Sequence, residues 1–101
     1  MTILEQIAEK MGWVYFSAGG YPLNEIGKNW ESVKALQARM VEDFYSITIR
    51  AFRNGQFEAE AFICHSLSPD TLPHRHIASA DTEPAAIVEL FKRVYGIKEG
   101  A

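Results

Sequence analysis

Residues 44–65, FYSITIRAFRNGQFEAEAFICH, decide the fold because two runs of alternating apolar and polar residues flank Asn54-Gly55. Alternation with a period of two is typical of a β-strand that has one buried and one solvated face. Asn-Gly between two such runs is a signal for a tight turn. The stretch therefore predicts an antiparallel β-hairpin against which the rest of the chain packs.

The turn of this hairpin determines which side chains share a face. A two-residue type I′ loop at Asn54-Gly55 would place Ile49 opposite Glu60 and mix apolar with charged residues. A three-residue loop, Arg53 to Gly55 with its glycine in the left-handed region, places Ile49 opposite Ala59 instead. Because a one-residue slip moves every side chain to the other face, we expect burial to select the three-residue loop. The same register pairs Ile47 with Ala61, Tyr45 with Ile63 and Arg50 with Glu58.

The residues before the hairpin predict two helices. Thr2 and Glu5 form a capping-box pattern, and apolar residues then recur at helical spacing until Gly12, which can end a helix. A second helix is expected from Asn24 to about Glu42 because apolar residues recur there every three or four positions. The glycine in its first turn lowers helix propensity by roughly 1 kcal/mol relative to alanine, which favours a later start. The apolar stripe of this helix consists of Ile26, Trp30, Val33, Leu36 and Met40.

The residues after the hairpin predict one more strand and one more helix. His74 to Ala80 is expected to be a third strand. Asp81 or Thr82 caps the last helix, Pro84 lies in its first turn, and Gly96 ends it. The order of elements, two helices, three strands and a helix, predicts an α+β fold with helices on an antiparallel sheet, in one domain over residues 1–101.

One hydrophobic core is expected to join these elements. The predicted core consists of Trp30, Val33, Met40, Ile47, Ile49, Ala59, Ile63, Ile87, Leu90 and Phe91.

On the outer side of the last helix, Glu89 and Arg93 are four residues apart and are expected to form an ion pair.

Composition narrows the class of protein. The 101 residues are 48% apolar and 23% charged, which is ordinary for a globular domain, and the net charge of −3 argues against nucleic-acid binding through the overall field. The single cysteine, Cys64, excludes an internal disulfide and fits a reducing compartment. No apolar run is long enough to cross a membrane, and the acidic start of the chain is unlike a signal peptide. We expect a cytoplasmic protein.

Several short motifs occur in a recognisable order along the chain. Met11-Gly12-Trp13 follows the first helix, and Trp30-Glu31-Ser32-Val33 lies in the second, four residues after Ile26. A charged hairpin comes next, and residues 78–87, ASADTEPAAI, then combine an Ala-x-Ala strand, an Asp-Thr cap and an Ala-Ile helix start. Over nearly its whole length the chain resembles the phage ABA sandwich domain, a family of small phage and prophage proteins. The resemblance implies the fold and a phage or prophage origin, and it implies no activity and no catalytic residue. The connection of residues 64–73 is longer than in that family pattern.

Four potential metal ligands lie close together in the sequence: Cys64, His65, His74 and His76. On a strand, His74 and His76 would share a face, and the end of a neighbouring strand could bring the cysteine near them. Their spacing matches no zinc motif, so the simpler interpretation is a set of polar residues beside a loop, with the cysteine as a small buried apolar residue. A thiolate nucleophile is the other chemical interpretation, and the sequence offers no group to activate it.

An aromatic, glycine-rich stretch follows the first helix. Trp13, Tyr15, Phe16 and Tyr21 surround Gly19-Gly20, and such segments either enter a core or form a binding surface. We expect Trp13 in the core and Tyr21 partly exposed. Tyr15, Phe16 and Tyr21 are therefore the candidate partner-binding residues.

Two acidic residues on the hairpin, Glu58 and Glu60, share a face as paired catalytic carboxylates would. Their simpler role is cross-strand pairing with Arg50 on a solvated sheet surface. The chain thus carries no catalytic signature, and no cofactor is expected.

The leading interpretation is a small non-enzymatic accessory protein that binds another protein. A first alternative is a nucleic-acid-binding module, because the tail of the chain is similar in topology to double-stranded-RNA-binding domains. The last helix opens with Asp81, Thr82 and Glu83 where such a domain needs basic residues, which argues against this alternative. A second alternative is a small metal-binding protein or metalloenzyme that uses Cys64, His74 and His76.

Overall fold

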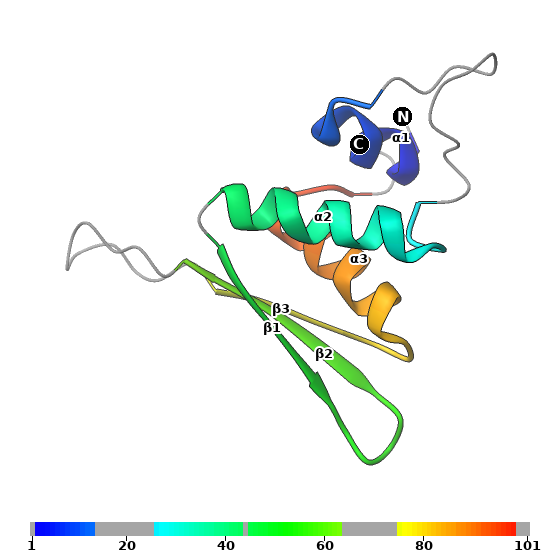
Figure 1. The fold of residues 1–101 in the computed structure, drawn as a ribbon, viewed down its shortest axis with the longest axis vertical. Coiled ribbons are helices and arrows are strands. Elements are labelled where there is room, and N and C mark those ends of the chain that lie inside the picture. The colour runs from blue at the N-terminus through cyan, green and yellow to red at the C-terminus, as the bar shows by residue number, and fades with distance from the viewer. Residues whose placement is uncertain (1, 14–25, 44, 64–74, 99–101) are drawn as a thin grey trace.

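The structure, a computed structural model, describes residues 2–13, 26–43, 45–63 and 75–98. In these ranges the elements follow the predicted order and form an α+β fold (Figure 1). They are α1 (Ile3–Met11), α2 (Trp30–Glu42), β1 (Tyr45–Ala51), β2 (Phe57–Ile63), β3 (Arg75–Ala80) and α3 (Glu83–Val94).

The three strands form one antiparallel sheet in the order β1-β2-β3. Ile49 lies opposite Ala59 and Arg50 opposite Glu58, so the register that burial favours is confirmed. The loop is the predicted three-residue one: the Phe52 amide donates to the Gln56 carbonyl at 2.9 Å. Gly55, with φ of 85°, donates its amide to the Phe52 carbonyl at 3.1 Å and supplies the left-handed residue.

The described helices cover one face of the sheet and leave the other bare. α3 lies against β2 and β3, and α2 lies against β1 and alongside α3 (Figure 1). On the covered face Ala59, Ala61 and Ala78 have almost no exposed surface. Because alanine side chains are small, the helices can approach the strands closely. The hairpin end of the sheet extends beyond both helices (Figure 1).

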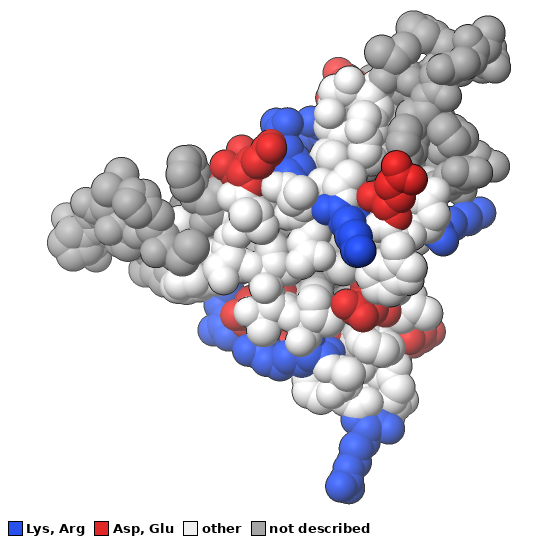
Figure 2. Space-filling view, in the orientation of Figure 1, with Lys and Arg blue, Asp and Glu red and all other residues white. Residues whose placement is uncertain are grey.

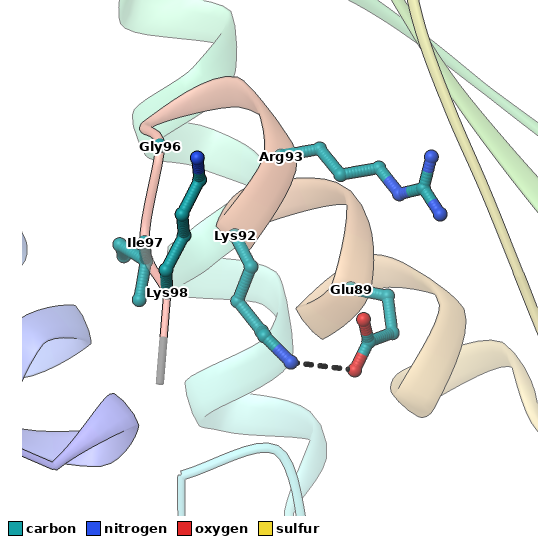
Figure 3. Close-up of a pocket in the computed structure, with 6 residues that line it drawn as sticks. All are labelled: Glu89, Lys92, Arg93, Gly96, Ile97 and Lys98. Carbon is teal, nitrogen blue, oxygen red and sulfur yellow. Dashed lines mark hydrogen bonds and ion pairs between the residues drawn. The ribbon is translucent and has the colours of Figure 1, made fainter. Parts of the chain in front are cut away.

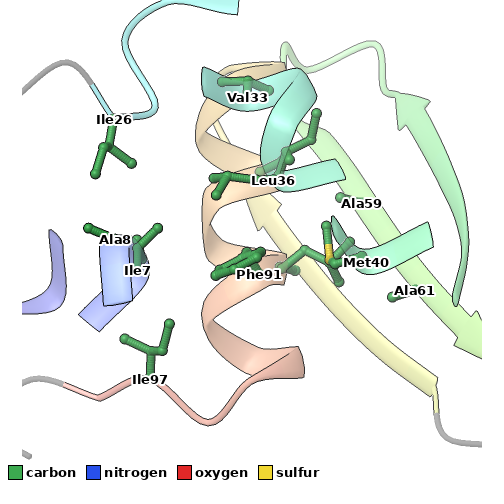
Figure 4. Packing of buried hydrophobic residues seen from close by; sticks show 14 residues of the cluster. Ile7, Ala8, Ile26, Val33, Leu36, Met40, Ala59, Ala61, Phe91 and Ile97 are labelled. Carbon is green, nitrogen blue, oxygen red and sulfur yellow. The ribbon is translucent and has the colours of Figure 1, made fainter. Parts of the chain in front are cut away.

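The core continues past the sheet to α1. Ile7 and Ala8 of α1 are fully buried and lie near Ile26, Ile97 and Phe91, so α1 closes the end of the helix layer (Figure 4). Of the predicted core residues, Val33, Met40, Ala59, Ile87, Leu90 and Phe91 are buried. Ile47 and Ile49 are partly buried against this cluster, and Ile63 is partly exposed.

The prediction for the second helix was wrong at its start. α2 begins at Trp30, since the Asn29 side chain caps it by accepting from the Ser32 amide at 2.8 Å. The residue at which the prediction started, Asn24, lies outside the described residues. Gly27 has a φ of 83°, which is incompatible with a helix and agrees with the low helix propensity of glycine. The apolar stripe of α2 therefore lacks the helical turns that were predicted before Trp30.

Trp30 is consequently not a core residue, and that prediction was wrong. As the first residue of α2 its side chain is 51% exposed. The buried volume near α1 is taken instead by Ile26, which lies before the helix rather than in it (Figure 4). The buried positions of α2 are Ser32, Val33, Leu36 and Met40.

The other predicted caps are confirmed. Thr2 and Glu5 form both hydrogen bonds of the capping box, each 3.1 Å long, and Gly12 ends α1 with a φ of 73°. Thr82 rather than Asp81 caps α3, with its hydroxyl accepting from the Ala85 amide at 3.2 Å. The third strand begins at Arg75, and its predicted first residue, His74, lies outside the described residues.

Candidate functional site

Most candidate site residues of the sequence lie outside the described residues: Cys64, His65, His74, Tyr15, Phe16 and Tyr21. His76 is described and lies opposite Ala61, so it belongs to the covered face of the sheet. Its ring meets the edge of the Tyr45 ring, with 5.9 Å between centroids. Within the described ranges, no group of three or more His, Cys, Asp or Glu side chains is placed to hold a metal ion.

Trp13, the described member of the aromatic stretch, packs against the core as expected. Its side chain is partly buried, and its amide donates to the Ala8 carbonyl at 2.8 Å just past the end of α1. It therefore packs against the core at the end of α1 and is only partly exposed.

The second face of the sheet, which none of the described helices covers, is the candidate site, and we name it the open face. Side chains that point away from the helices come from alternate positions on each strand. The strand register sets them in rows across the sheet. These rows are Ser46, Phe62 and Arg75; Thr48, Glu60 and Ile77; and Arg50, Glu58 and Ser79.

An ion-pair network occupies the middle of the open face. Arg50 Nη1 lies 2.8 Å from Glu58 Oε1 and 3.6 Å from Glu60 Oε2, which confirms the predicted cross-strand pairing. From the other side Arg75 donates to Glu60 Oε2 through Nε at 2.9 Å and Nη2 at 2.6 Å. The Arg75 hydrogen bonds, followed by the charges of both arginines, lower the pKa of Glu60 below its ordinary value. Glu60 is therefore held in its ionised form.

Two large apolar side chains flank this network. Phe62 is 37% exposed and Ile77 is 38% exposed. Because Phe62 is opposite Arg75 and Ile77 is opposite Glu60, the two apolar residues lie at diagonal positions on adjacent strands, one on each side of the Arg75–Glu60 ion pair. The open face thus combines an apolar pair with arginines that are held in place by carboxylates.

Sequence reasoning identified one half of this surface and missed the other. The hairpin register gives Arg50, Glu58 and Glu60 directly. Arg75 and Ile77 could be placed beside them only through the pairing of β2 with β3, and the long connection between these strands leaves that register open. The available signal was the alternation of Arg75, Ile77 and Ser79 with His76, Ala78 and Ala80.

A second polar cluster joins the ends of α2 and α3. The Tyr95 hydroxyl donates to Asp43 Oδ2, and Arg39 Nε lies 3.4 Å from the same oxygen. Burial, followed by the Asp43 carboxylate, raises the pKa of Tyr95 well above its ordinary value. The Tyr95 ring also contacts Phe91, with 4.5 Å between centroids. Tyr95 is thus held in its neutral form as a hydrogen-bond donor that ties the end of α3 to the end of α2.

A shallow cleft of about 320 Å³ lies at the end of α3 (Figure 3). Within it, Lys92 Nζ donates to Glu89 Oε1 at 2.8 Å, so the predicted pairing of Glu89 with Arg93 was wrong. Arg93 points away from both residues (Figure 3). Both i,i+3 and i,i+4 partners are neighbours on a helix, and here the i,i+3 partner forms the pair. The cleft presents no converging catalytic groups.

Charges of both signs are interleaved over α2 and the adjacent sheet on the side shown in Figure 2. This distribution agrees with the small net charge of −3 and provides no broad basic surface on that side. None of the described helices combines the length and apolar character that a membrane crossing requires.

Comparison with known proteins identifies no relative of the chain. The chain matches no protein-family model, no curated protein and no solved structure.

Proposed function

We propose that the chain is a small non-enzymatic accessory protein of phage or prophage origin that acts by binding another protein. The observation that carries the binding role is the open face of the sheet, where Phe62 and Ile77 are exposed beside fixed arginines. Aromatic residues and arginines are enriched in protein interfaces and supply most of their binding energy. The proposed origin is supported by the sequence resemblance, above all by residues 78–87.

The nucleic-acid alternative receives less support. Each arginine of the open face is already paired with a carboxylate, and within the described residues the two arginines form no run of basic side chains that could follow a phosphate backbone. α3 opens with Glu83 in its first turn, directly after Asp81 and the cap Thr82. A carboxylate there would repel a phosphate.

Affinity capture from an infected or lysogenic host tests the proposal. The tagged wild-type chain is expected to retain a specific protein, and the double variant Phe62→Ser, Ile77→Ser is expected to lose it. Val41→Ser is the control, because Val41 is an apolar residue on α2 that is even more exposed, at 54%, and lies outside the open face. Equal capture by all three chains would place the binding site elsewhere, and capture of no protein by the wild type would contradict the proposed function.

A further inference from the structure

We infer that the open face takes a partner segment that is both acidic and apolar. In this arrangement Arg50 and Arg75 hold carboxylates of the partner, and Phe62 and Ile77 contact its apolar side chains. The inference rests on the proposed function and adds to it the chemical class of the partner.

The outermost charges of the open face are cationic. The side chains of Arg50 and Arg75 are 46% and 56% exposed, whereas those of Glu58 and Glu60 are 24% and 12% exposed. A partner that approaches the sheet therefore meets guanidinium groups first, with the carboxylates lying beneath them. Charge complementarity favours an acidic partner.

Both arginines keep hydrogen-bonding capacity toward a partner. A guanidinium group carries five N–H donors. Within the described residues Arg75 uses Nε and Nη2 for Glu60, and Arg50 uses Nη1 for Glu58. The remaining N–H groups suit a carboxylate, which guanidinium groups bind in a planar geometry.

The carboxylates also fix the arginines in position. An arginine that is free in solution loses rotamer entropy when it binds, and this loss weakens association. Glu60 holds Arg75 through two short hydrogen bonds, so part of that entropy is already lost in the folded protein. The same hydrogen bonds lower the pKa of Glu60, so the anchor stays charged below the pH at which an ordinary glutamate takes up a proton. The arginines are thus preorganised for binding.

The apolar pair decides between an acidic protein segment and other acidic ligands. Phe62 and Ile77 lie on adjacent strands next to Arg75 and Glu60, so a ligand that covers them must bring apolar groups as well as charge. A phosphate backbone does not meet both requirements. A second copy of this chain would bring its own outward arginines against these arginines.

A library of random peptides displayed on yeast tests the inference with the full chain as the labelled probe. The enriched peptides are expected to combine Asp or Glu with apolar residues. Their affinity is expected to fall as salt rises and by at least about ten-fold for the double variant Arg50→Gln, Arg75→Gln. Arg53→Gln is the matched control, because Arg53 is an exposed arginine of the hairpin loop and is not part of the open face. Circular dichroism checks that each variant is folded.

The salt titration of the wild-type chain keeps the test informative even if the double variant does not fold. Enriched peptides without an acidic excess, or affinities that neither salt nor the arginine substitutions change, would overturn the inference. A library that yields no binder would overturn it as well.

Duplex RNA is measured in parallel, and binding to it that the arginine substitutions abolish would assign the face to phosphate instead. If host capture depends on Phe62 and Ile77 but not on Arg50 and Arg75, the proposed function stands and this inference fails. If neither peptides nor a host protein bind, both fail.

Discussion

The two faces of the sheet are built from the same strands but carry opposite chemistry. On β2, Ala59 and Ala61 point toward the helices and are fully buried, while Glu58, Glu60 and Phe62 point away from them. Where α3 lies against β2 and β3, the covered face has the small side chains of Ala59, Ala61 and Ala78, which let the helix approach closely. The open face has long side chains that reach one another across strands. The first set stabilises the fold, and the second is available for contacts outside it.

The largest expected difference between the two sides is in stability. Leu90 is fully buried in α3, which covers β2 and β3, so Leu90→Ala is expected to lower the free energy of unfolding by about 2–5 kcal/mol. Phe62→Ser on the open face is expected to lower it by less than about 1 kcal/mol. Urea unfolding followed by circular dichroism measures both changes.

Ile49→Ala sharpens this comparison because Ile49 is only partly buried against the core. Its loss is expected to be at the lower end of the same range, about 2 kcal/mol or less. A change for Phe62→Ser as large as that for Leu90→Ala would show that the open face also contributes to the core.

Gly27 tests how closely the helix layer is packed. It has a φ of 83°, and a Cβ atom there would lie 2.7 Å from Val88 Cγ2. Gly27→Ala is therefore expected to lower the free energy of unfolding by about 2–3 kcal/mol, through backbone strain and steric overlap together. The double variant Gly27→Ala, Val88→Ala removes the overlap and is expected to recover part of this loss relative to Val88→Ala alone. No recovery would mean that strain alone is responsible.

Gly55 provides the corresponding test where nothing is packed around the residue. Its φ is 85°, and a Cβ atom there would meet no other atom within 4 Å. Gly55→Ala is expected to lower the free energy of unfolding by only about 1 kcal/mol, from strain alone. Asn54→Asp is the control within the same loop, because it keeps a side-chain oxygen that can accept from the Gln56 amide, and a three-residue loop predicts a smaller loss for it. An equal loss for Asn54→Asp would contradict strain at Gly55 as the cause.

The contrast between the two faces explains why the strands and their register could be predicted from the sequence. The period-two pattern of residues 45–63 predicts both the strands and their register. One face is apolar, so a one-residue slip in the strand pairing would bury charged side chains. Helix caps are equally local, so Thr2, Gly12 and Thr82 could be identified from a few neighbouring residues. These features depend on short-range rules, and the structure confirms them.

Features that depend on tertiary packing were harder to predict. Trp30 and Ile26 fit one helical stripe, but the cap at Asn29 starts the helix only at Trp30. Ile26, before the helix, is then buried, and Trp30 is exposed. Only the hairpin half of the open face could be predicted from the sequence. The third strand joins the hairpin through a long connection, and the length of that connection does not determine the register of β3 against β2. The pairing of β3 with β2 is what places Arg75, Ile77 and Ser79 on the same face as the charged residues of the hairpin.

The smallest expected effect concerns the acid stability that the open face contributes. The pKa of Glu60 is lowered in the folded protein, chiefly by the hydrogen bonds from Arg75, whereas in the unfolded chain it should stay near its ordinary value of 4.5. As pH falls below that value, the unfolded chain takes up the proton first, so the folded state loses stability until Glu60 is protonated as well. The contribution is fully present above the ordinary pKa and is lost below it.

Glu60→Gln removes this titration and is expected to flatten the acid limb of a plot of unfolding free energy against pH. Glu42→Gln is the control, because Glu42 is an exposed carboxylate of α2 that forms no salt bridge within the described residues. The wild-type slope should persist in that variant. If Glu60→Gln left the acid limb unchanged, Arg75 would not be holding the carboxylate in solution. The arginines of the open face would then lack the anchor that preorganises them, and the two faces of the sheet would differ in burial alone.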